Sequence, residues 1–145
     1  MDHAASPLTG SLLTPMLALI VWSLAMTAWL FVTRIPAIQK AGITPKDARE
    51  PTSLEALPLA VRQVGYNYSN LMEQPTLFYA LVAYTYLAGQ QDGLNIALAW
   101  GYVALRVVHS LIQSTVNAVL VRFGVFLLGT LVLAAVAARD VLALF

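Results

Sequence analysis

Ionisable and amide side chains interrupt two long apolar stretches of this 145-residue chain. Glu73 is the only formally charged residue between positions 63 and 91, and Asn70 precedes it by three positions. In the next apolar stretch, Arg106, His109 and Gln113 follow one another at i, i+3 and i+7. A charge at the depth of a bilayer costs about 2.5 kcal/mol or more, so these side chains are candidates to bind a ligand, carry a proton or specify assembly.

The composition is that of an integral membrane protein in contact with the lipid bilayer. Hydrophobic residues make up 59% of the chain and charged residues 10%, whereas a soluble domain carries about 25% charged residues. The formal net charge of +1 provides no basic surface for nucleic acid. Cysteine is absent, which excludes a protein thiol nucleophile and disulfides, and we expect no metal site.

Four segments are long enough to cross a hydrocarbon core of about 30 Å, which requires about 20 apolar residues in a helix. The expected spans are residues 11–33, 62–88, 94–116 and 118–142. They predict a single all-α domain, with one long loop at residues 34–57 and two short turns. Basic residues occupy this loop and its flanks: Arg34, Lys40, Lys46, Arg49 and Arg62. The positive-inside rule therefore places the loop in the cytoplasm and both termini outside.

The second and third spans each carry a polar stripe. At about 100° per residue, the members of each stripe project from one face of their helix. The stripes are Arg62, Tyr66, Asn70 and Glu73 in the second span, and Arg106, His109, Gln113 and Asn117 in the third. Glu73 and Arg106 each lie about 15 Å from the cytoplasmic ends of their spans. We therefore predict that these two charges pair, directly or through a ligand or water, inside the bundle or at a subunit contact.

Each of these residues also has a purely structural interpretation. A buried Glu73–Arg106 pair can fix helix register without any other role. His109 can be a satisfied core histidine, and Arg122 can extend to the lipid headgroups.

The motifs in these spans resemble the MAPEG superfamily, the membrane-associated proteins of eicosanoid and glutathione metabolism, and its bacterial members most closely. The residues that carry the resemblance are Asn70-x-x-Glu73-x-Pro75-x-x-Phe78, Arg106-x-x-His109, Asn117 and Arg122-Phe123, after a long basic first loop. The resemblance implies a homotrimer of four-helix protomers in the bacterial inner membrane.

The resemblance also implies that glutathione binds as a co-substrate between neighbouring subunits near the cytoplasmic face. The implied contacts are Arg34, Arg62, Tyr66, Asn70, Glu73, Arg106, His109 and Gln113. Glu73 suits the ammonium group, and Arg122 matches the catalytic arginine that stabilises the glutathione thiolate. Tyr66 stands where many glutathione-using relatives have an arginine, and Arg62 lies one turn earlier on roughly the same face.

Three functional interpretations follow. The first is a glutathione-dependent transferase or peroxidase acting on lipophilic electrophiles that arrive from the bilayer. The second is a small proton-coupled transporter with Glu73 as the proton carrier. The third is a non-catalytic membrane subunit whose polar stripes only specify assembly. Pairing with Arg106 argues against the transporter, because it would hold Glu73 ionised.

Overall fold

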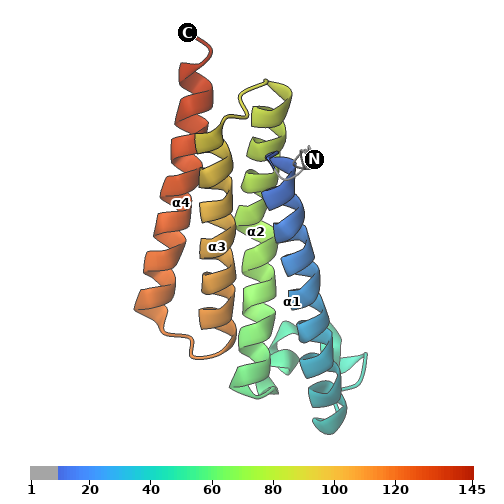
Figure 1. Cartoon of the computed structure of the whole chain (residues 1–145). Helices are drawn as coiled ribbons and strands as arrows, with labels where there is room; N and C mark the ends of the chain where they lie inside the picture. The colour runs from blue at the N-terminus through green and yellow to red at the C-terminus, as the bar shows by residue number, and fades with distance from the viewer. Residues whose placement is uncertain (1–9) are drawn as a thin grey trace, which may run out of the picture.

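Four long helices form an antiparallel bundle in the computed structural model, which describes residues 10–145 (Figure 1). The helices are α1 (Leu13–Lys40), α2 (Leu59–Leu87), α3 (Gly93–Ser114) and α4 (Val119–Leu142). Two 3-10 helices, η1 (Asp47–Arg49) and η2 (Pro51–Ala56), lie in the α1–α2 connection. The described residues contain no strand, so the predicted all-α four-helix bundle is confirmed.

The bundle has two distinct ends (Figure 1). The α1–α2 connection and the α3–α4 turn lie together at one end, called here the loop end. The start of α1, the α2–α3 turn and the end of α4 lie at the opposite end, called here the terminal end. Because both connections at the loop end belong to one face of the membrane, residues of α2 near its start lie level with residues of α3 near its end.

Membrane insertion follows from the outer surfaces of the helices. Within residues 10–145, α1, α3 and α4 are long and apolar enough to cross a bilayer. The outward faces of α1 and α4 expose side chains such as Leu24, Val32, Leu120 and Leu131. Every backbone polar group of a helix interior is bonded within the helix, so lipid can cover such a surface. α2 has 29 residues but is interrupted by polar side chains, and it is not among these three helices.

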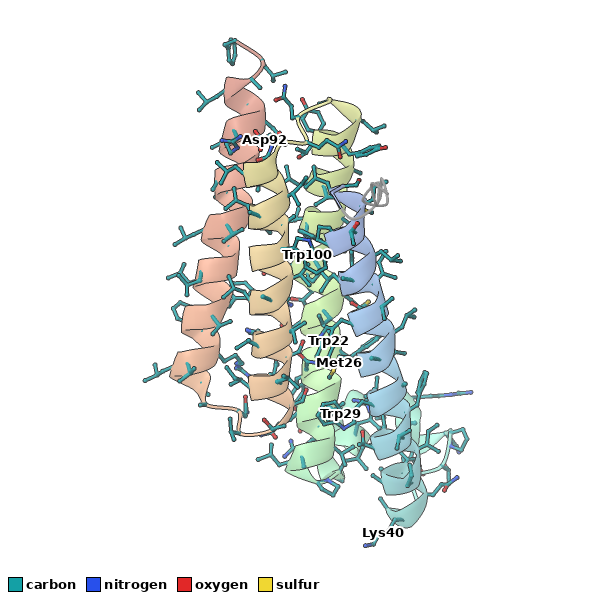
Figure 2. All side chains as sticks on the ribbon, in the orientation of Figure 1. Trp22, Met26, Trp29, Lys40, Asp92 and Trp100 are labelled. Atoms are coloured by element: carbon teal, nitrogen blue, oxygen red, sulfur yellow. The ribbon has the colours of Figure 1, made fainter. Side chains whose placement is uncertain are left out.

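α1 is longer than the span expected from hydropathy. The helix continues to Lys40, although we expected residues 34–57 to form a loop. Pro36 lies inside the helix. A proline removes one backbone hydrogen bond, and the helix continues past it. α1 ends where Gly42 takes a φ of 67° and donates to the carbonyl of Gln39 at 3.1 Å. Glycine favours this left-handed conformation at a helix end. Figure 2 shows Lys40 at the extreme loop end of the bundle.

α3 is shorter than expected, ending at Ser114 instead of residue 116. Asn117 takes a φ of 48° and donates its backbone N–H to the carbonyl of Ile112 at 2.7 Å. Asparagine tolerates this left-handed conformation better than most side chains. Asn117 therefore belongs to the α3–α4 turn and does not extend the polar stripe of α3.

The main apolar core lies between the helices in the half of the bundle nearer the terminal end. Its buried members are Leu12, Leu19, Phe78, Val82, Ala99, Tyr102, Val103 and Leu133. The rings of Phe78 and Tyr102 stack with their centroids 4.6 Å apart. The Tyr102 ring also faces Gly129 of α4. Most buried polar side chains of α2 and α3 lie toward the loop end, whereas Thr85 and Asn95 lie toward the terminal end.

A polar clasp joins α3 to α4 at the terminal end, where Figure 2 labels Asp92. Asp92 caps α3 by accepting the backbone N–H of Asn95 at 2.8 Å, and it forms an ion pair with Arg139 of α4. Arg139 Nε also donates to Asn95 Oδ1 at 2.7 Å. The Asn95 hydrogen bond and the Arg139 charge lower the pKa of Asp92 below its ordinary value of 3.8.

We expect Asp92→Asn to lower the thermal midpoint at neutral pH. Asparagine keeps the N-cap acceptor, so the change removes chiefly the charge that faces Arg139. Because the pKa of Asp92 is lowered in the folded protein, its carboxylate stabilises the fold above the unfolded pKa. That contribution disappears as the pH falls through the folded value, below 3.8. Thermal unfolding in detergent should show a difference between the two proteins at neutral pH that closes in acid; a pH-independent difference would contradict this.

Candidate functional site

Arg106 is the buried charge at the centre of the polar half of the bundle. Its side chain is 1% exposed. Nη1 donates to Gln74 Oε1 at 3.2 Å, and Nη2 donates to the backbone carbonyl of Asn70 at 2.8 Å. Among the described residues, Arg106 Nε has no partner. The guanidinium is therefore held by neutral oxygens of α2, with no carboxylate bonded to it and with hydrogen-bonding capacity left over.

The side-chain amide of Gln74 joins α2 to α3 through its oxygen and to α4 through its nitrogen. Its Oε1 accepts from Arg106 and from the Tyr102 hydroxyl at 3.4 Å, and its Nε2 donates to Thr130 Oγ1 of α4 at 2.7 Å. Sequence reasoning did not place Gln74 in the site. The signal was present, because Gln74 lies at i+4 from Asn70, and this spacing puts two residues on one helix face.

Asn70, Gln113 and His109 form a chain of contacts toward the α3–α4 turn. Asn70 Nδ2 donates to Gln113 Oε1 at 2.8 Å. His109 Nε2 lies 3.1 Å from the same oxygen, and His109 Nδ1 lies 3.2 Å from the backbone carbonyl of Arg122. The Arg122 guanidinium donates from Nη1 to Asn117 Oδ1 at 2.6 Å. The fold thus brings Asn70, Arg106, His109 and Gln113 together and joins them to Arg122 at the loop end.

Glu73 does not form a direct ion pair with Arg106. Its side chain is exposed on the protomer, and the one ion pair among residues 10–145 is Arg139–Asp92. Glu73 and Gln74 project about 100° apart around α2, and it is Gln74 that faces α3. A direct pair inside the protomer was therefore a wrong expectation. A pair bridged by a ligand, or formed at a contact with a second copy, stays a prediction.

Arg34, Arg62 and Tyr66 lie in a different place from Arg106. They line a pocket of about 430 Å³ between the end of α1, the start of α2 and η2. Tyr66 is 51% exposed. On the wheel of α2, Glu73 projects about 60° from Asn70 toward the side of Arg62. Within one protomer the predicted site residues therefore fall into two groups, the α2–α3 network and the α1–α2 pocket, and Glu73 faces outward between them.

The pattern of helices, stripes and loop-end arginines agrees with a comparison against protein families. A family model described as MAPEG family matches residues 12–142, which include all four helices and both groups of polar residues. The chain belongs to the MAPEG family. Comparisons with curated proteins and with solved structures returned no match. In this MAPEG protein, residues 10–145 contain no group of three His, Asp or Glu side chains placed to hold a metal ion.

Three buried polar side chains near Arg106 were also missed from the sequence. Asn67 on α2 is 0% exposed, and neither of its amide atoms has a partner among the described residues. Ser110 and Ser114 on α3 are buried, and their hydroxyls likewise have none. The Asn70–Gln113 bond sets the two antiparallel helices in register, so Asn67 lies closer to the level of Ser114 than to that of Ser110. Such orphaned groups weaken a fold unless a water or ligand satisfies them.

We expect Asn67→Leu to raise the thermal midpoint of this MAPEG protein. An unsatisfied buried amide costs about 1–3 kcal/mol, and leucine removes that cost at similar volume. Asn70→Leu is the matched control and should lower the midpoint, because it removes the hydrogen bond that Asn70 donates to Gln113 Oε1. Both variants are compared by thermal unfolding in one detergent. A lower midpoint for Asn67→Leu would mean that Asn67 is satisfied by a bound molecule.

Proposed function

We propose that this MAPEG protein is a glutathione-dependent transferase or peroxidase that acts on lipophilic electrophiles. The observation that carries the proposal is the buried Arg106 guanidinium, held by Asn70 and Gln74 and connected through His109 and Gln113 to the loop end. A buried cation lined by amides, with one nitrogen still free, suits an anionic polar ligand. The polar network lies in a chain whose outer surface is in contact with lipid, where a lipophilic co-substrate would be dissolved.

The side chains of the network match the groups of glutathione, which carries two carboxylates, one ammonium group and a thiol. Arg106 is the candidate partner of a carboxylate, with Asn70, His109 and Gln113 positioning it. Glu73 is the candidate partner of the ammonium group, and its exposed carboxylate is free of ion pairs within residues 10–145. The chain has no cysteine, so the reacting sulfur has to come from the substrate.

Arg122 is the candidate catalytic residue. A thiol reacts as its thiolate, and a nearby guanidinium lowers the thiol pKa. Arg122 lies at the start of α4, where its guanidinium is oriented by Asn117 and its carbonyl contacts His109. Placed on the sulfur, this guanidinium would stabilise the thiolate that attacks the electrophile. The contacts link the position of Arg122 to the same network that would hold the tripeptide.

The proposal includes a homotrimer with the loop end in the cytoplasm, as the MAPEG resemblance implies. Glu73 and the Gln74–Thr130 hydrogen bond are exposed on the isolated protomer. Polar groups left against lipid are costly, so a neighbouring copy that covers them is favoured. Such a copy would also supply Arg34, Arg62 and Tyr66, whose predicted contact with glutathione requires a second subunit because they line a separate pocket in their own chain.

Calorimetry with glutathione on the purified protein tests the proposed function. We expect millimolar or tighter binding, lost in Arg106→Ala and retained in Arg49→Ala, where the replaced arginine is exposed in η1. Ultraviolet absorbance should report the bound thiolate. No binding at millimolar glutathione, together with no thiolate signal, would exclude the proposal.

A proton-coupled transporter is the second candidate, and one observation favours it. The Glu73 carboxylate is exposed and forms no ion pair with Arg106 within the described residues. This candidate predicts pH-dependent substrate flux into proteoliposomes that is lost in Glu73→Gln. The non-catalytic assembly subunit predicts neither flux nor glutathione binding, with defects of polar-stripe variants confined to assembly.

A further inference from the structure

Thr130 of α4 accepts a hydrogen bond from the side chain that holds Arg106. Its hydroxyl donates to the backbone carbonyl of Phe126 at 3.0 Å and lies 2.7 Å from Gln74 Nε2. A hydroxyl has a single proton, and a carbonyl oxygen can only accept. The Thr130 proton is therefore used within α4, and toward Gln74 the hydroxyl acts as an acceptor.

The opposite end of the Gln74 amide meets two donors. Arg106 Nη1 donates to Oε1 at 3.2 Å, and the Tyr102 hydroxyl donates to the same oxygen at 3.4 Å. A guanidinium has no acceptor, so an inverted amide would set N–H groups against N–H groups at Arg106. Thr130 and Arg106 thus require the same orientation of the amide, with its nitrogen toward α4 and its oxygen toward α3.

A glutamine side chain has several rotatable bonds, and ordering it costs conformational entropy. Gln74 is only partly buried, at the surface where α2 meets α4, so packing alone does not fix its amide. The bond to Thr130 holds the nitrogen end of the amide, and this keeps the oxygen end on the guanidinium. Thr130 therefore influences Arg106 through Gln74, without contacting it.

The oxygens that hold Arg106 carry no net charge. They are Gln74 Oε1 and the backbone carbonyl of Asn70, and the Arg106 side chain is 1% exposed. A buried charge without a counter-ion is costly, and an anionic ligand that reaches it offsets that cost. A carboxylate at position 74 would neutralise the guanidinium inside the protein. The amide instead leaves the charge of Arg106 available to a ligand.

We propose that Thr130 is a positioning residue for anion binding at Arg106. It holds the Gln74 amide so that a neutral oxygen faces the guanidinium, whose charge is then left for a carboxylate of the ligand. The inference rests on the proposed function, in which glutathione supplies that carboxylate. It gives the middle of α4 a part in binding, in addition to the network of α2 and α3.

Calorimetry with glutathione on Thr130→Val and Thr130→Ser tests the proposal. Valine keeps the branched shape but removes the acceptor, so we expect affinity about fivefold weaker, the effect of one hydrogen bond between membrane helices. Serine keeps the hydroxyl and should bind as the wild type does. Thr27→Val is the matched control, because the Thr27 hydroxyl donates within α1, to Ser23 O at 2.8 Å, and it should also bind normally. Unchanged affinity in Thr130→Val, or reduced affinity in Thr130→Ser, overturns the proposal.

Gln74→Glu separates positioning from a general structural role. A carboxylate at this position pairs with Arg106 inside the protein, so glutathione affinity should fall about tenfold or more. The same pair should leave the thermal midpoint unchanged or raise it. Loss of a merely structural contact would instead lower both affinity and midpoint, and that result, or wild-type affinity in Gln74→Glu, counts against the proposal.

A double-mutant cycle distinguishes failure of this inference from failure of the proposed function. Thermal unfolding of Thr130→Val, Arg106→Met and the combined variant requires no glutathione. Because Gln74 lies between the two residues, positioning predicts that the combined variant loses less stability than the two single changes added together. If the wild type binds no glutathione, the proposed function fails, and the cycle still decides whether Thr130 positions Arg106: coupled effects support it and additive effects overturn it.

Discussion

Arg106→Met should weaken glutathione binding by about 100-fold, which corresponds to about 3 kcal/mol. The reason is the loss of a buried guanidinium that already donates to Gln74 and Asn70 and has Nε free for a ligand. Methionine has a similar length, but removing the guanidinium takes a donor away from the buried oxygens of Gln74 and Asn70, which lowers stability. We therefore expect a lower thermal midpoint, with affinity measured by calorimetry at a temperature where the variant is folded.

Arg139→Met provides the matched control for this effect. It removes another arginine that joins two helices, but one that is partly exposed and binds Asp92 and Asn95 at the terminal end. This variant should lose thermal stability and keep its glutathione affinity. If both variants bind glutathione as the wild type does, Arg106 has only a structural role; if both lose binding, the effect is a general loss of folding.

Arg122→Gln should lower kcat/KM for conjugation by about 100- to 1,000-fold, the usual consequence of removing one donor from a developing anion. The KM for glutathione should change far less, because the tripeptide is held by the Arg106 network. Without the guanidinium, the pKa of the bound thiol rises, so the thiolate absorbance should appear only at higher pH. The pH profile of kcat/KM should move in the same direction.

Asn117→Gly separates the presence of the guanidinium from its orientation. Glycine accepts the φ of 48° found at this position, but it removes the Oδ1 atom to which Arg122 donates. We expect a rate between those of the wild type and Arg122→Gln, with thiolate formation retained. A wild-type rate and thiolate signal in Arg122→Gln would remove Arg122 from the mechanism.

Glu73 and Gln74, which are neighbours in the sequence, show a limit of inference from the sequence. Asn70, Glu73 and Arg106 were recognised because an amide or charge stands out in an apolar stretch. In the structure, Arg106 contacts Gln74 and not Glu73. A helical wheel fixes the angle between these two side chains but not the rotation of α2 against α3, and that rotation selects which of them meets the arginine.

The helix ends show a second limit. Hydropathy placed the end of the first span at Thr33, because Arg34 begins the basic region. The helix nevertheless continues to Lys40 and ends at Gly42, whose positive φ permits the closing hydrogen bonds. The width of the apolar region estimates where the membrane ends, whereas backbone geometry decides where the helix ends.

By itself, the sequence determined that this is an all-α membrane protein of the MAPEG family. It also predicted a polar stripe on the second and on the third span, and the structure shows that Asn70, Arg106, His109 and Gln113 of these stripes meet between the helices. Hydropathy and helical period suffice for the fold class and the stripes, because the bilayer requires helices and each helix sorts its own residues onto faces. The tertiary structure alone decided that Arg34, Arg62 and Tyr66 line a separate pocket and that Glu73 faces outward. These are consequences of how helices pack against one another, and the pattern within a single helix does not contain that information.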